Sequence, residues 1–285
     1  MRIHVLFLSS WFPSKVHSTL GNFVLNHAEA AAKECDVSIL YLAKQTAINN
    51  IQLDEEIIDG IRIVRVYYPK NGFFFRTRFK AFKVGYRHLF ANKNLPNIIQ
   101  MNMIWPEGWQ AWFLKKKFKI PYCISDNWTG YHADQRAPLS FFQKKYMQFI
   151  ANNSSKLIPV TSHLESAMRH INFKVESEII PNVINLNIFT SERKADSNTI
   201  QFLHVSHLDD NHKNISGILR VWKEIAKEHS NVHLKIGGDG PVEKWKSFAR
   251  QLEIPPRSIS FFGTSSSKEI ASIMHSSHAF VLFSN

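Results

Sequence analysis

The 285-residue sequence has only two cysteines, no long apolar run and fewer acidic than basic side chains. Cys35 and Cys123 both lie beside strand-like apolar segments. That placement is typical of reduced core thiols and not of a disulfide scaffold or a metal site. No segment approaches the roughly 20 apolar residues that span a bilayer. The apolar opening at residues 2–8 is too short for a secretory signal, so we expect a cytoplasmic protein.

Two groups of motifs are also missing. A dinucleotide-binding fold carries G-x-G-x-x-G directly after its first strand, whereas residues 9–14 read SSWFPS. This argues against a nicotinamide or flavin oxidoreductase. Zinc-finger spacing, basic-region heptads and RNP-type aromatic motifs are absent, so nucleic acid is not the expected partner of the formal net charge of +12. Phosphorylated small molecules and anionic lipid headgroups are the remaining explanations for that charge.

Short apolar, β-branched segments alternate with helical patterns along the whole chain, which predicts parallel sheets with crossover helices. Each predicted strand is nearly continuous in apolar residues, as in a sheet that helices cover on both faces. The first set of predicted strands comprises residues 3–9, 36–42, 61–68, 97–103, 121–126 and 156–160. The second set comprises residues 200–205, 231–236, 259–262 and 278–283, with helices predicted at 214–229, 242–252 and 268–276.

A polar stretch at residues 190–199 separates the two sets and fits a linker. We therefore predict an α/β protein with two doubly wound Rossmann-like domains, covering residues 1–190 and 191–285. A doubly wound domain has about five or six strands, with its ligand at their carboxyl ends. Because the second set stops at its fourth strand, this interpretation treats the second domain as incomplete.

Nine short motifs, each weak alone, occur in an order that resembles glycosyltransferase family 4. They are SSWFPS, GNFVLNHA, PNIIQMN, WPEGWQA, IPYCISDNWTGY, IIPNVINLNIF, HVSHLDDNHKN, LKIGGDGP and FFGT, and they run through nearly all of residues 3–285. The resemblance implies the GT-B architecture, in which an acceptor-side and a donor-side Rossmann-like domain face a cleft. It also implies retaining chemistry, a nucleotide-sugar donor, a saccharide acceptor and no bound metal or other cofactor. Bacterial surface-polysaccharide synthesis is the pathway it suggests.

Donor binding needs positive charge, because without a metal the leaving diphosphate must be met by cationic side chains and helix N-termini. The resemblance gives this role to Lys213 and to His207, which stands where the family carries arginine and is only conditionally charged. Gly21, at the start of a predicted helix, would let the backbone approach a phosphate; an ordinary turn glycine is the alternative. The resemblance places further donor contacts at Gly238, Asp239, Gly240, Phe262 and Gly263.

The expected catalytic group is altered. Family members carry a histidine after the fifth strand of the first domain, and the resemblance places Asn127 at that position. An amide can hydrogen-bond a sugar hydroxyl but cannot shuttle a proton. Asp126 and His132 are nearby candidates for a substitute. Two glutamates that follow the last matching strand in the family have no counterpart here, so no residue is assigned to their role.

Residues 70–90 interleave phenylalanines with lysines and arginines. This composition suits an interfacial helix that meets anionic headgroups and a lipid-linked acceptor, which predicts peripheral contact with the inner face of the cytoplasmic membrane. An amphipathic helix packed on the sheet, with its cations in water, is the alternative.

Two other functions stay open at the level of sequence. A non-catalytic relative would keep the fold without the chemistry, as His207 and Asn127 would allow. A sugar-nucleotide epimerase of related two-domain architecture would turn over without any acceptor.

Overall fold

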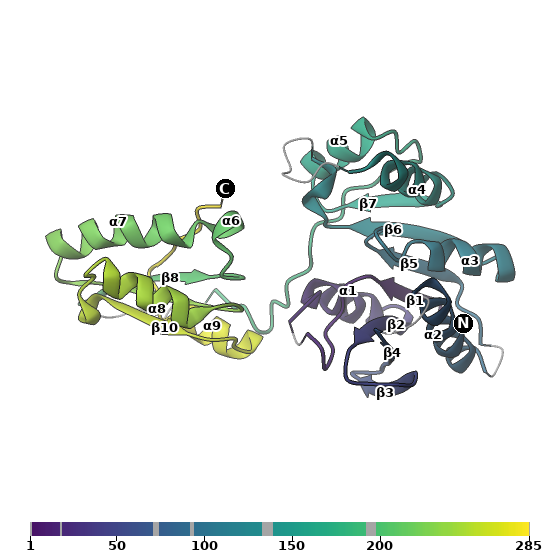
Figure 1. The fold of residues 1–285 in the computed structure, drawn as a ribbon, viewed down its shortest axis with the longest axis horizontal. Helices are drawn as coiled ribbons and strands as arrows, with labels where there is room; N and C mark the ends of the chain where they lie inside the picture. The colour runs from purple at the N-terminus through teal and green to yellow at the C-terminus, as the bar shows by residue number, and fades with distance from the viewer. Residues whose placement is uncertain are drawn as a thin grey trace. The chain divides into compact units, whose positions relative to one another are not determined.

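The computed structural model describes residues 2–17, 19–70, 74–91, 94–132, 139–191 and 198–284. The chain forms two compact units, Met1–Val183 and Ile184–Asn285, each built on its own sheet (Figure 1). The division falls before the predicted boundary after residue 190, and residues 192–197 of the predicted linker lie outside the described residues.

The first unit contains a sheet of order β3-β4-β2-β1-β5-β6-β7. Its neighbours pair in parallel, except that β3 is antiparallel to β4. Because β1 lies between β2 and β5, the direction of winding reverses there, and ligands of such sheets bind at the carboxyl ends near this switch point. The strands are β1 (His4–Ser9), β2 (Asp36–Gln45), β3 (Gln52–Ile58), β4 (Ile61–Pro69), β5 (Ile98–Asn102), β6 (Tyr122–Asp126) and β7 (Lys156–Pro159).

Strand β3 was not predicted, because an edge strand needs few apolar residues and most of β3 is exposed. The register pairs Ile58 with Ile61, so Asp59 and Gly60 form the two-residue connection to β4. Both have positive φ, of 49° and 80°, as the mirror-image turns of hairpins require. The Asp-Gly dipeptide is therefore the sequence signal that could have revealed this strand.

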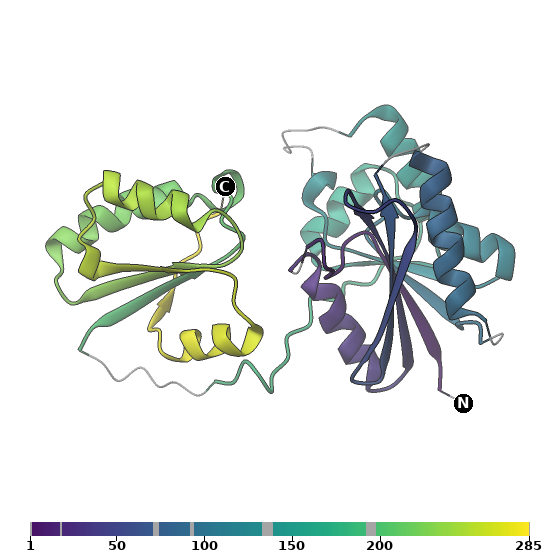
Figure 2. The same ribbon diagram turned by 60° about the horizontal axis from the view of Figure 1, so that its bottom comes forward.

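Helices cover both faces of the first sheet. Phe7 packs in one core with Val24 and Ala28 of α1 (Asn22–Ala32), whereas its strand neighbours Leu6 and Leu8 belong to a second core. Successive side chains of a strand point to opposite faces, so the two cores lie on opposite sides of the sheet, as Figure 2 shows for α1 and α2. The second core is completed by α2 (Phe74–Leu89), α3 (Trp109–Phe118), α4 (Phe141–Asn152) and α5 (Ser162–His170).

A buried ion pair fastens α2 to the segment that leads into α3. The side chains of Arg78 and Glu107 are 6% and 7% exposed, and Arg78 Nη2 donates to Glu107 Oε1. Gln110 Nε2 donates to the other carboxylate oxygen. Burial raises the pKa of the Glu107 carboxyl, and the bonds from Arg78 and Gln110 oppose that rise. The pair therefore fixes the position of α2 at a site where either charge alone would be costly.

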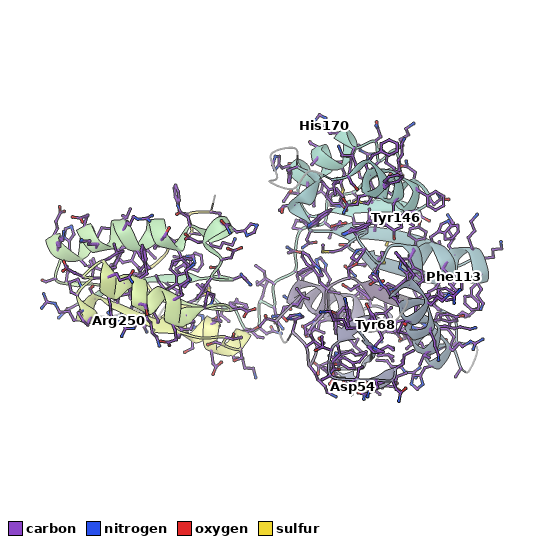
Figure 3. The ribbon with its side chains drawn as sticks, viewed as in Figure 1. Asp54, Tyr68, Phe113, Tyr146, His170 and Arg250 are labelled. Atoms are coloured by element: carbon purple, nitrogen blue, oxygen red, sulfur yellow. The ribbon has the colours of Figure 1, made fainter. Side chains whose placement is uncertain are left out.

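We expect Glu107→Ala to destabilise the protein strongly, because it leaves the Arg78 charge buried opposite a methyl group. Breaking a buried pair in this way costs about 3–5 kcal/mol, measurable by urea unfolding. Asp54→Ala is the control, since Asp54 (Figure 3) pairs with Lys15 at side-chain exposures of 34% and 71%. Its loss should stay below about 1 kcal/mol, and equal losses in the two variants would contradict a dominant role for the buried pair.

The second unit has a parallel sheet of order β10-β9-β8-β11. Its strands are β8 (Ile200–Val205), β9 (Val232–Gly237), β10 (Ile259–Phe262) and β11 (Ala279–Phe280), and its helices are α6 (Asp210–Lys213), α7 (Ile215–Glu228), α8 (Val242–Gln251) and α9 (Ser267–His275). Strands β8 and β10 have the predicted bounds, but β11 is shorter than the predicted 278–283. Within the described part of the chain, β11 pairs with β8 alone, and it is exposed. No helix among the described residues of either unit is long and apolar enough to cross a membrane.

Candidate functional site

The loops after β8 and β9 are joined by backbone hydrogen bonds. Ser206 N donates to Gly237 O at 3.1 Å, and Leu208 N donates to Asp239 O at 2.7 Å. These bonds hold two loops at the carboxyl ends of neighbouring strands, where ligands of doubly wound sheets bind. Four of the predicted donor-binding residues lie in this joined pair of loops: His207, Gly238, Asp239 and Gly240.

Two of these glycines are required by the packing of the loops themselves. Gly238 has φ of +128°, and a Cβ there would lie 2.0 Å from Ser206 O. Gly240 has φ of +130°, and a Cβ there would lie 3.2 Å from Leu208 Cβ. Residues other than glycine rarely adopt such φ values. The close approach of the two backbones therefore explains both glycines without any ligand.

Lys213 lies at the switch point of the second sheet. It ends α6, and its Nζ donates to Ser284 Oγ at 3.4 Å, beyond β11. Asn214 follows with φ of 46° and caps α7 by accepting a bond from Gly217 N at 3.2 Å. The winding of the second sheet reverses between β8 and β11. Because Lys213 directly precedes Asn214, it places a cation beside the N-terminus of α7, which carries partial positive charge.

His204, which was not predicted, connects the strand β8 to the segments on either side of the Lys213 site. It is fully buried in β8, with Nδ1 2.8 Å from Val281 O and Nε2 2.7 Å from Ser206 Oγ. Burial lowers the pKa of His204, the charge of Lys213 adds to that lowering, and the bond to Val281 opposes it. A neutral imidazole therefore connects β8 to the chain after β11. Its place within the HVSH motif was the available signal.

Phe262 and Gly263 lie two strands away from β8, at the end of β10. The Phe262 ring rests on Gly237, since a Cβ on Gly237 would lie 2.3 Å from the ring. At Gly263, a Cβ would have no described atom within 4 Å. Packing therefore requires glycine at position 237, whereas Gly263 borders open space.

Gly238→Ala should reduce the free energy of unfolding by about 2 kcal/mol or more, because it combines a backbone conformation that disfavours alanine with a clash against Ser206 O. Gly263→Ala adds the same methyl group where there is room, and its effect should stay within about 0.5 kcal/mol. Urea unfolding of both variants measures the difference. Similar losses would show that the contact between the loops does not constrain position 238.

In the first unit, Asp126 is a buried anchor. Its side chain is fully inaccessible to solvent and accepts bonds from Ile104 N at 3.0 Å, Trp128 N at 2.9 Å and the Tyr131 hydroxyl. Burial raises the pKa of Asp126, and these donors oppose the rise. The bonds connect the end of β6 to the segment after β5 and to the short 3-10 turn Thr129–Tyr131. This geometry favours a positioning role for Asp126 over proton transfer to a substrate.

Asn127 belongs to a chain of polar contacts. Its Nδ2 donates to Asn182 Oδ1 at 2.6 Å, and the same oxygen lies 3.3 Å from His27 Nε2 in α1. Burial lowers the pKa of His27, and the bond to Asn182 opposes that change. Sequence reasoning did not single out His27 or Asn182, although the GNFVLNHA and IIPNVINLNIF motifs contain them.

Gly21 and His132 have different surroundings. Gly21 precedes α1 with φ of 75°, and a Cβ there would lie 2.4 Å from Trp11 O in the loop after β1. Close contact with this loop therefore requires glycine. His132 lies on the side of α5, where its ring stacks on His163 with centroids 4.2 Å apart. Residues 133–138 lie outside the described residues.

Two family models match this chain, and they divide it close to the boundary between the two units. The model of Glycosyltransferase Family 4 matches residues 20–188. This chain belongs to glycosyltransferase family 4. The model of glycosyl transferases group 1 matches residues 188–285, so the two family models together span both units. Sugar transfer is the activity of this family.

Solved structures give the same fold, which confirms the predicted GT-B architecture. The chain is similar to the lipopolysaccharide outer core galactosyltransferase WaaB in its apo form, with TM-score 0.61, 14% identity and coverage of 99% of this chain and 74% of that one. It is also similar to the catalytic domain of starch synthase IV from Arabidopsis thaliana bound to ADP and acarbose, with TM-score 0.61, 11% identity and coverage of 98% of this chain and 78% of that one. A third similar structure is that of a putative UDP-N-acetylglucosamine 2-epimerase from Listeria monocytogenes, with TM-score 0.54, 10% identity and coverage of 98% of this chain and 74% of that one. Among curated proteins, no sequence matches that of this chain.

Proposed function

We propose that this family 4 member transfers a sugar, with retention of its anomeric configuration, from a nucleotide-sugar donor to a saccharide or lipid-linked saccharide acceptor. Synthesis of a bacterial surface polysaccharide is the proposed setting. The observation that carries the proposal is the position of Lys213, which is held beside Ser284 at the switch point of the second sheet. The starch synthase structure, which shares the fold, was solved with ADP.

The proposed donor site uses charge from the protein alone. Lys213 and the N-terminus of α7 supply positive potential for the leaving diphosphate, and His207 is exposed in the joined loops. Fixed donors of this kind stabilise the charge that develops on the leaving group without reorganising. The proposed mechanism therefore needs no metal.

In the proposed transfer, the acceptor oxygen forms a bond to the anomeric carbon while the bond from that carbon to the diphosphate breaks. The leaving phosphate oxygen takes the acceptor proton, because the Asn127 amide cannot accept one. Asn127 is proposed to hydrogen-bond a sugar hydroxyl, with its orientation set by the bond to Asn182. Asp126 holds the turn in place.

The donor is identified by thermal unfolding of the full chain with UDP, GDP, ADP or CMP. A ligand at about 100 times its dissociation constant adds about 2.7 kcal/mol of stability, and we expect one nucleoside diphosphate to raise Tm by several degrees. Lys213→Gln should weaken the binding of that nucleotide roughly tenfold and so remove about 1.4 kcal/mol of the stabilisation. Lys227→Gln is the control, since Lys227 lies at the other end of α7 and pairs with Glu224.

The absence of any shift, or an equal shift in the two variants, would contradict the proposed donor site and favour a non-catalytic relative. The fold shared with the Listeria protein keeps the epimerase alternative open, because a shared fold does not distinguish a transferase from an epimerase. Turnover of the identified nucleotide sugar without an acceptor would establish the epimerase. Release of the nucleoside diphosphate only when an acceptor is present would establish the transferase.

We also propose that α2 and α4 contact an anionic membrane surface. The phenylalanines of residues 70–90 differ in burial: Phe82 is fully buried, whereas Phe75 is 80% exposed. Phe73 lies outside the described residues. On α4, Phe141 and Phe142 are 67% and 82% exposed. Both helices cover the same face of the sheet, and exposed cations lie among these aromatic side chains: Arg76, Lys80, Lys144 and Lys145.

Aromatic rings connect these two helices across α3. Phe79 lies 5.3 Å from Phe113 of α3 (Figure 3), and Trp112 of α3 lies 5.4 Å from Phe149 of α4, between ring centroids. Ring contacts through α3 therefore join the two helices that carry the exposed phenylalanines, and exposed aromatic side chains of this kind suit insertion into an interface.

We expect Phe142→Ser to weaken binding to vesicles that contain phosphatidylglycerol by roughly tenfold, since inserting one phenylalanine contributes about 1.5–3 kcal/mol. Ile57→Ser is the control, because Ile57 is 71% exposed but lies on the edge strand β3. Sedimentation with vesicles measures both. Equal binding by the two variants, or equal binding to neutral phosphatidylcholine vesicles, would contradict the proposed surface.

A further inference from the structure

One face of α5 lines a cavity of about 540 Å³, a size typical of small-molecule sites. The spacing of its residues is i, i+3, i+4 and i+7, which places them on one side of a helix. The helix contributes His163, Ser166, Ala167 and His170. The other walls come from the 3-10 turn, from the segment before α4, and from α4 itself: Gly130, Tyr131, His132, Leu139 and Lys144, with Ile171 at the end of α5.

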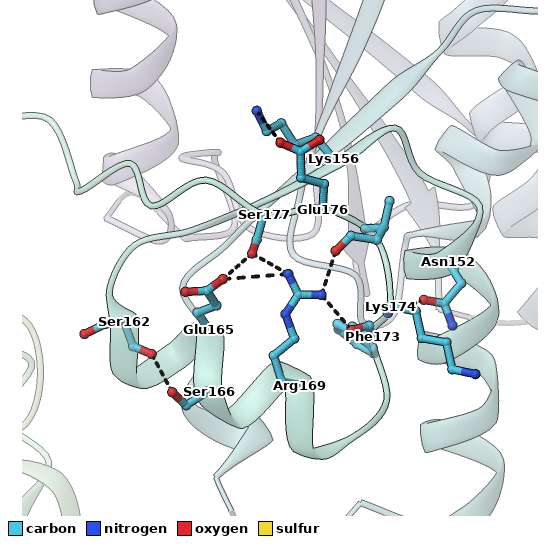
Figure 4. A network of polar contacts seen from close by, with 11 residues as sticks. Asn152, Lys156, Ser162, Glu165, Ser166, Arg169, Phe173, Lys174, Glu176 and Ser177 are labelled. Carbon is cyan, nitrogen blue, oxygen red and sulfur yellow. Dashed lines mark hydrogen bonds and ion pairs between the residues drawn. The ribbon is translucent and has the colours of Figure 1, made fainter.

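The opposite face of α5 is locked to the chain that follows it. Arg169 Nη1 donates to Phe173 O at 2.9 Å and to Val175 O at 2.7 Å, and its Nη2 donates to Ser177 Oγ (Figure 4). The Ser177 hydroxyl in turn donates to Glu165. Rotation of α5 would break all of these contacts, so the face with the histidines is held in place before any ligand arrives. A preorganised face reduces the cost of binding.

The cavity is rich in basic groups. Three histidines and Lys144 line it, and no described lining residue is acidic. The rings of His132 and His163 are stacked, with centroids 4.2 Å apart and planes at 20°. An anion in the cavity could accept hydrogen bonds from the Lys144 ammonium and from ring N–H groups of the histidines, as the oxygens of a phosphate can.

We propose that this cavity binds a phosphate group of the acceptor. The inference rests on the proposed function and places the acceptor in the first unit. Lys144 follows Phe141 by three residues in α4 and belongs both to the cavity lining and to the exposed cations of the proposed membrane surface, so the cavity borders that surface. A phosphate carried by a lipid at that surface can therefore reach the cavity, and a soluble sugar phosphate offers the same group.

Isothermal titration of the full chain with glucose 1-phosphate tests the cavity. Lys144→Gln and His163→Gln should each weaken binding by roughly tenfold, as expected when a charge-assisted hydrogen bond is lost. Lys145→Gln is the matched control, because Lys145 is the next residue of α4, does not line the cavity, and lies over the Phe141 ring. It should change the affinity by less than about twofold.

Vesicles that contain a polyprenyl phosphate distinguish the two sources of the group. Binding of these vesicles that exceeds binding of phosphatidylglycerol vesicles, and that falls more in Lys144→Gln than in Lys145→Gln, supports a lipid-linked acceptor. Binding of glucose 1-phosphate alone, with the same dependence on Lys144, supports a soluble one. Absence of phosphate binding by the unmodified chain, or equal affinity in Lys144→Gln and Lys145→Gln, would overturn the proposal.

The nucleoside diphosphate shift, measured on the same variants, separates this inference from the proposed function. If the unmodified chain binds glucose 1-phosphate through Lys144 but no nucleoside diphosphate raises its Tm, the phosphate site in the cavity is supported and the donor site is contradicted. If a nucleoside diphosphate still raises Tm while Lys144→Gln leaves phosphate binding unchanged, the donor site is supported and the phosphate site is contradicted.

Discussion

The buried carboxylate of Asp126 is the interaction on which the candidate site of the first unit depends. A charge without access to water is costly unless donors surround it, and here two backbone N–H groups and the Tyr131 hydroxyl do so. Those donors come from the segments after β5 and after β6. The carboxylate therefore determines where the two loops lie, and with them the positions of Asn127 and of His132, which borders the cavity beside α5.

The second unit achieves the same result with neutral groups. Backbone bonds join the loops after β8 and β9, the glycines at 238 and 240 allow the chains to approach, and the imidazole of His204 connects β8 to the chain after β11. In both units, buried and satisfied polar groups support half-buried ones, such as Asn127 and Lys213. Preorganisation of this kind is what a site that must stabilise developing charge requires.

The sequence was sufficient for the buried strands, because a strand covered on both faces is a nearly continuous apolar segment, as in β2 and β6. It was insufficient for β3 and for the length of β11, where the sheet has an edge and the apolar signal fades. Motif order was enough to identify the family. It could not separate the fully buried Asp126 from the half-buried Asn127, since adjacent polar residues look alike until their distant partners, Ile104 and Asn182, are known.

Strand β3 also has a consequence for the solubility of folded copies. It forms one border of the first sheet, where an unpaired row of backbone groups could recruit a strand from another copy. Three successive carboxylates occupy this border, and each meets a cation of the same unit: Asp54 with Lys15, Glu55 with Arg62 and Glu56 with Arg65. Charged side chains along an edge strand disfavour its pairing with another strand, and a second copy would have to pack against these ion pairs. The arrangement therefore opposes edge-to-edge aggregation on this side of the sheet.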